Sequence, residues 1–199
     1  MPIRYFLVPA LLLAAAAPLP DLRVEPTTGG SYFYIKNTAT RPLTAYLIEL
    51  VDYPGSSYSL YVDDAAGEPL APGAERKTRV SSMTVGAVPD YVKMQAAVYA
   101  DGTTAGIPEK IALLLERRHR VLETTTELIA RLEKPGEAPD GLRKWASTLV
   151  PSGKKQIPPA EAAAWQLIME TAAQLGAKSP AEIVEGLKVS QKALQTTKP

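Results

Sequence analysis

The longest helical pattern in the chain runs without interruption over residues 108–134, and it constrains the fold more than any other segment. Pro108 suits a first helical position, and Pro135-Gly136 ends the pattern. The apolar residues keep helical spacing: Ile111, Leu114, Leu115, Leu122, Ile129 and Leu132. A helix of about 27 residues is roughly 40 Å long, whereas a strand of six to nine residues spans about 20–30 Å. The helix is therefore predicted to extend beyond any sheet on which it packs, so its far half needs other partners.

The segment before this helix, residues 21–106, is broken by turn residues every eight to twelve positions. Such spacing predicts an antiparallel β-sandwich of six or seven strands. The six predicted strands cover residues 22–25, 31–37, 43–53, 58–63, 75–81 and 91–100, and a further strand is predicted near residues 83–88. The strand from Leu43 carries apolar residues on both faces, which indicates a central strand covered on both sides.

The segment after the long helix carries three shorter helical patterns, at residues 140–150, 159–175 and from Pro180 onward. The last one opens with Ser179-Pro180-Ala181-Glu182, the pattern of a capping box. Short links containing proline or glycine predict that the four helices of residues 107–195 form a compact bundle. The fold class is therefore predicted to be α+β, with a β-sandwich followed by a helical region.

Four short motifs of the β segment resemble those of bacterial immunoglobulin-like (fibronectin-III-like) domains of exported proteins. They lie at residues 34–38 (YIKNT), 42–46 (PLTAY), 70–74 (LAPGA) and 98–103 (VYADGT). The resemblance covers residues 21–104, and its motifs are residues typical of turns and strand ends. It implies an immunoglobulin-like sandwich and a role as a spacer or recognition module, although a fold alone does not assign a function.

Residues 1–17 have the pattern of a secretory signal peptide. Arg4 supplies a positive charge, residues 5–13 are apolar, and Ala14 to Ala17 are small residues suited to cleavage, which we expect near Ala16. The chain contains no cysteine, so it has neither a lipobox nor disulfide bonds. The sequence predicts a secreted or periplasmic protein with no membrane span after cleavage.

Charge is distributed unevenly along the chain, whose formal net charge is +1. Residues 21–106 carry 7 basic and 10 acidic residues, and residues 107–199 carry 14 and 11, so the two parts have opposite net charges of −3 and +3. This difference favours docking between them. It provides no concentrated basic face, so nucleic acid is not an expected partner.

The sequence offers no catalytic or metal-binding constellation, and we expect no cofactor. His119 is the only histidine and lies between arginines, which opposes the protonation that a general base requires. The four residues 117–120 (RRHR) are interpreted as a solvated helix face with some contact to the sheet rather than as a patch for an anionic ligand, because consecutive helical positions point about 100° apart. Asp63-Asp64 and Asp101 are interpreted as turn residues, with calcium binding as the alternative.

Eight of the nine tyrosines lie between Tyr32 and Tyr99, and Tyr53, Tyr58 and Tyr61 surround one loop. Exposed tyrosines on loops can bind sugars or proteins. These three are the candidate ligand-binding residues, although tyrosine is also an ordinary strand residue. The favoured function is a non-catalytic exported binding or scaffolding protein with an envelope protein or glycan as partner. The alternatives are a carbohydrate-binding module using this loop and a carboxylate-dependent hydrolase of cell-wall or polysaccharide material.

Overall fold

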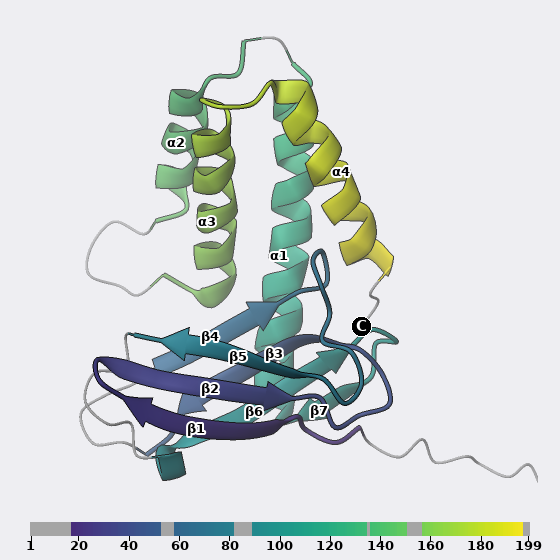
Figure 1. Ribbon diagram of the computed structural model, residues 1–199. Coiled ribbons are helices and arrows are strands. Elements are labelled where there is room, and N and C mark those ends of the chain that lie inside the picture. Colours follow the sequence, from purple (N-terminus) through teal and green to yellow (C-terminus); the bar gives the residue numbers. More distant parts are fainter. Residues whose placement is uncertain (1–16, 53–57, 82–88, 135, 151–156, 197–199) are drawn as a thin grey trace, which may run out of the picture.

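The computed structural model describes residues 17–52, 58–81, 89–134, 136–150 and 157–196. Strands occupy the N-terminal part and helices the C-terminal part, as predicted for the α+β class (Figure 1). Residues 1–16 of the predicted signal peptide and the strand predicted near residues 83–88 lie outside the described residues. Within those residues, no helix is long and apolar enough to cross a membrane.

Two antiparallel sheets contain the seven strands of the described residues. The first has the order β1 (Asp21–Thr27), β2 (Gly30–Lys36) and β5 (Glu75–Val80). The second has the order β4 (Tyr58–Asp63), β3 (Leu43–Leu50), β6 (Val92–Tyr99) and β7 (Thr104–Gly106), with a short 3-10 turn, η1 (Pro89–Tyr91), leading into β6. The strand pairs are antiparallel throughout.

Six of these strands match predicted ones, whereas β7 does not. Three residues of β7 pair with β6 and are too few to show a strand pattern. Gly106 allows this pairing, because its φ is +110° and a Cβ there would lie 2.2 Å from the carbonyl oxygen of Gln95. The predicted strand over residues 43–53 ends at Leu50, where β3 stops.

The second sheet is covered on both faces, which confirms the prediction for β3. Phe33 and Ile35 of the first sheet share one core with Tyr46 and Ile48 of β3. The opposite face of β3 carries Ala45 and Leu47, which pack with Leu114 of the long helix in a second core. The two apolar faces of one strand therefore belong to two different cores.

The long helix is α1 (Pro108–Leu132), and three shorter helices follow: α2 (Pro139–Thr148), α3 (Pro159–Gln174) and α4 (Pro180–Thr196). Their bounds lie within about two residues of the predicted ones. The predicted capping box of α4 is present, since the Glu182 N–H donates to Ser179 Oγ at 3.4 Å and the Ser179 N–H to Glu182 Oε2 at 2.9 Å.

Helix α1 belongs to both halves of the molecule. Its first turns lie on the second sheet through Leu114, and its last turns pack Leu128 and Leu132 against the other three helices. Figure 1 shows α1 rising from behind the sheets, with α3 and α4 on either side. The 25 residues of α1 give a length of about 37 Å. The prediction that this helix extends beyond the sheet is thus confirmed.

Candidate functional site

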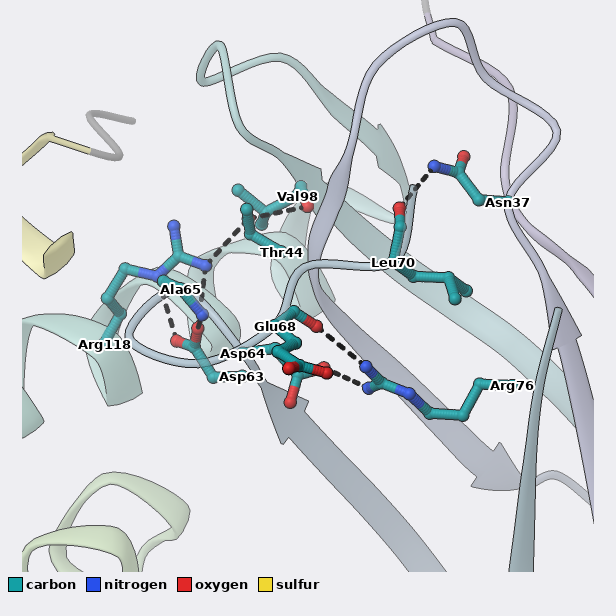
Figure 2. A network of polar contacts seen from close by, with 10 residues as sticks. All are labelled: Asn37, Thr44, Asp63, Asp64, Ala65, Glu68, Leu70, Arg76, Val98 and Arg118. Carbon is teal, nitrogen blue, oxygen red and sulfur yellow. Dashed lines mark hydrogen bonds and ion pairs between the residues drawn. The ribbon is translucent and has the colours of Figure 1, made fainter. Parts of the chain in front are cut away.

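A buried ion pair joins α1 to the end of β4 (Figure 2). Arg118 donates from Nε to Asp63 Oδ2 and from Nη2 to Asp63 Oδ1, both at 2.9 Å. Its Nη2 also donates to Thr44 Oγ1 at 3.1 Å, and the Thr44 hydroxyl donates to the carbonyl of Val98. The side chains of Arg118 and Asp63 are only 5% and 8% exposed. This fork geometry fixes the first turns of α1 relative to β3 and β4.

Asp63 and its neighbour Asp64 bind different arginines. Asp63 Oδ1 also accepts the Ala65 N–H at 3.1 Å, while Asp64 pairs with Arg76 of β5. Figure 2 shows the two carboxylates pointing to opposite sides of the turn that follows β4. Within the described residues, no group of three or more histidines and carboxylates lies close enough together to hold a metal ion. The turn is thus stabilised by ion pairs on each side.

Residues 117–120 combine the two properties expected of them: Arg118 makes the contact with the sheet, and His119 is solvated, being 72% exposed beside Glu123. The angle of about 100° between consecutive positions sends each side chain in a different direction. Arg118 enters the β–α interface, and Arg120 pairs with Glu161 of α3 at 3.0 Å. The sequence contained no signal for the burial of Arg118, because its partner lies 55 residues away.

A cavity of about 210 Å³ lies between α1, α3, α4 and the turn after β4. Three residues spaced four apart on α1 line its floor, namely Arg117, Val121 and Thr125. The walls are largely apolar, with Leu167 of α3 on one side and Leu187 and Leu194 of α4 on the other. We call this cavity the α3–α4 groove.

Arg117 is the charged group at the sheet end of the α3–α4 groove. Burial lowers the pKa of its guanidinium, and the nearby Asp63 carboxylate partly offsets that effect. Within the described residues, Arg117 has no carboxylate within the 4.0 Å of an ion pair, and Asp63 is bound on both oxygens by Arg118. The groove thus presents a partly desolvated cation whose donors are free for a ligand.

The other end of the groove carries Glu170, whose Oε1 accepts a hydrogen bond from Gln166 at 2.8 Å. Helix α3 runs parallel to α1, because its Glu161 contacts Arg120 while its Ile168 packs in the bundle core with the last turns of α1. Glu170 lies nine residues beyond Glu161, or about 13 Å further along the helix. Arg117 and Glu170 therefore lie at opposite ends of the groove, with apolar side chains such as Val121 and Leu187 between them.

The predicted tyrosine site is only partly described. Tyr58 packs against the core between the sheets, whereas Tyr61 packs against Ile111 and Leu115 of α1, so they lie on opposite faces of β4. Burial, followed by the charge of Glu49, raises the pKa of Tyr61. Tyr53 lies outside the described residues. Ligand binding by these three residues stays a prediction.

Two other tyrosines, Tyr32 and Tyr34, lie on the outer face of the first sheet. The guanidinium of Arg23 lies 3.6 Å from the ring centroid of Tyr34, and Lys77 Nζ lies 4.0 Å from that of Tyr32. These cation–π contacts occupy ring faces on which a sugar would stack. The rings of Tyr32 and Tyr34 thus already stack with cationic side chains of the same sheet.

Comparison with family models, with curated proteins and with solved structures finds no match to this chain.

Proposed function

We propose that this chain is an exported, non-catalytic binding protein. In this proposal an immunoglobulin-like β-sandwich carries a helical bundle, and the α3–α4 groove receives a small ligand. The observation that carries the proposal is Arg117, a partly desolvated cation without an ion-pair partner among the described residues, at the end of a groove that Leu167, Leu187 and Leu194 line with apolar surface. Charged groups are seldom buried without a partner, so a partly buried arginine with free donors is a favourable position for a ligand to supply one.

The contacts of α1 with both halves support a preformed binding site. Helix α1 contributes to the core against the sheet and to the core of the bundle. Two ion pairs join it to the strands, Arg118 with Asp63 and Lys110 with Glu49 at 2.7 Å. In both, the cation comes from α1 and the carboxylate from the β part, as the opposite net charges of the halves favour. The floor and the sheet end of the groove therefore keep one geometry, which lowers the cost of binding.

Contacts of the first described residues agree with the proposed cleavage near Ala16, because the residues that follow it belong to the fold. The carbonyl of Leu19 accepts a hydrogen bond from the Thr38 hydroxyl at 3.2 Å, and that of Pro18 accepts one from Tyr99. Cleavage before these residues would leave the fold intact. In addition, two motifs of the immunoglobulin-like resemblance contact each other, since Asn37 Nδ2 donates to the carbonyl of Leu70 at 2.9 Å.

The environment of the carboxylates favours binding over hydrolysis. A glycoside hydrolase uses one protonated and one ionised carboxyl group on either side of the scissile bond. At the groove, both oxygens of Asp63 accept hydrogen bonds from Arg118, so this carboxylate already serves a structural contact. Glu170 accepts from Gln166 at the other end. Asp63 thus holds the structure together, and Glu170 places a negative charge at the far end of the groove, as suits a binding site.

A thermal-shift screen of the mature protein against small acids, amines, alcohols and sugars tests the groove as the binding site. Ser190→Phe places a ring in the groove from α4, and Lys192→Phe, two residues further on the exposed side, is the matched control. We expect ligands that raise the melting temperature of the wild type and of the control but not of Ser190→Phe. Ligands that stabilise all three proteins equally, or an absence of ligands, would refute this site.

Export is tested separately by N-terminal sequencing of the protein from periplasmic and culture fractions. We expect a mature chain that begins near Ala17. A chain that retains Met1 and stays in the cell interior would contradict the localisation, whatever the outcome of the ligand screen.

A further inference from the structure

We propose that the ligand of the α3–α4 groove is a small amphiphilic monocarboxylate. Its carboxylate pairs with Arg117 and its apolar chain lies along Val121, Leu187 and Leu194. This inference rests on the proposed function and adds the chemical class of the ligand. It follows from three properties of the groove: the charge at its sheet end, the charge at its other end, and its size.

The sheet end selects an anion with a planar, forked acceptor. Arg117 is partly buried and has no ion-pair partner among the described residues. Its nearest acidic neighbour, Asp63, already uses both oxygens to bind Arg118 and the Ala65 N–H. A carboxylate can accept two parallel hydrogen bonds from one guanidinium, and this geometry favours arginine over lysine at such sites.

The neighbouring carboxylates select a single negative charge. In the described part of the chain, Arg117 is the one arginine or lysine that lines the groove, and Asp63 and Glu170 line it too. A doubly charged phosphate at Arg117 would be repelled by Asp63 more strongly than a monoanion. A dicarboxylate long enough to fill the groove would bring its second charge toward Glu170. The groove therefore favours one carboxylate followed by an uncharged chain.

The size and apolar lining of the groove set the length of that chain. A volume of about 210 Å³ holds about seven groups of the size of water, at roughly 30 Å³ each. This corresponds to a carboxylate with a chain of about six to eight carbons in total. The leucines at 167, 187 and 194 provide the apolar contact. Each added methylene should tighten binding about fourfold until the groove is full.

Isothermal titration calorimetry of the mature protein with hexanoate, octanoate, octanol, octylamine and suberate tests this inference. We expect octanoate to bind about fifteenfold more tightly than hexanoate, and octanol, octylamine and suberate to bind at least tenfold more weakly than octanoate. Arg117→Gln should weaken octanoate binding tenfold or more. Arg143→Gln, on the exposed side of α2, should bind octanoate as the wild type does.

Arg117→Gln should also unfold at the same urea concentration as the wild type, because Arg117 has no ion pair to lose. Weaker binding with unchanged stability separates a ligand-binding role from a structural one. Octanol that binds as tightly as octanoate, or full binding by Arg117→Gln, would overturn the inference. If an amine or a sugar binds the wild type but not Ser190→Phe, the inference fails while the proposed function stands. If nothing binds in the groove, both fail.

Discussion

Removal of one member of the buried pair between Arg118 and Asp63 should destabilise the whole protein. Arg118→Met keeps an apolar side chain of similar length but deletes the guanidinium. Asp63, whose side chain is 8% exposed, then keeps only the hydrogen bond from the Ala65 N–H at 3.1 Å among the contacts of the described residues. A buried charge left without its partner typically costs about 3–5 kcal/mol. The loss should lie at the lower end of this range, about 3 kcal/mol, because two charged hydrogen bonds at 2.9 Å disappear together while the charge of Arg117 nearby offsets part of the cost.

Urea denaturation at pH 7, followed by tryptophan fluorescence and by far-UV circular dichroism, measures this loss. Asp63→Asn should cost a similar amount, and the double variant should cost no more than either single one. The resulting coupling energy would be about 3 kcal/mol. Arg76→Met breaks a more exposed pair, in which the side chains of Arg76 and Asp64 are 28% and 25% exposed. This variant should cost only about 1 kcal/mol. Additive losses, or single losses below about 1 kcal/mol, would refute the argument.

Three further predictions concern the cores, a helix terminus and the short strand β7. Leu114→Ala and Leu128→Ala, one in each core of α1, should each cost about 2–5 kcal/mol in urea denaturation; a large difference in cooperativity between them would show that the halves unfold separately. Hydrogen bonds from the Ser179 side chain and backbone lower the pKa of Glu182 from 4.5, so their stabilisation is present above pH 4.5 and is lost as pH falls through the lowered pKa. In Ser179→Ala that pKa, measured by NMR, should rise, and the stability difference from the wild type should shrink in acid. Gly106→Ala should cost more than about 1 kcal/mol, since its φ is +110° and the new Cβ would lie 2.2 Å from a carbonyl oxygen of β6; a fully stable variant would contradict this.

Local sequence signals were sufficient to predict most elements of this fold. Proline at the first turn and glycine or a capping box at the boundaries placed the helices within about two residues. The length of α1 relative to a strand predicted that it would belong to both halves, because a helix of that length cannot bury its apolar face on a sheet alone. The short strand β7 was missed, since its three residues depend on pairing with β6 and on the conformation of Gly106.

The site was harder to predict, because its properties depend on distant contacts. Arg117 and Arg118 are adjacent and chemically identical, and the sequence alone treats them alike. The position of Leu114 on the sheet fixes the rotation of α1 and sends Arg118 toward Asp63. Arg117 is turned by about 100° toward α3 and α4, two elements that begin more than forty residues later in the chain. No local sequence pattern indicates which of the two arginines pairs with a carboxylate.

The structural pair and the proposed ligand site are also linked through Asp63. As long as Arg118 binds both oxygens of Asp63, that carboxylate is not available to Arg117, whose pKa responds to it only through its charge. In Arg118→Met, Asp63 would be free to pair with Arg117 and to compete with a ligand carboxylate. The variant should therefore lose octanoate binding as well as stability, even though Arg117 and the apolar walls are intact. Adding Asp63→Asn removes the competitor and should restore binding. If binding remained at the wild-type level in Arg118→Met, Asp63 would not control the charge of the groove, and the linkage would be refuted.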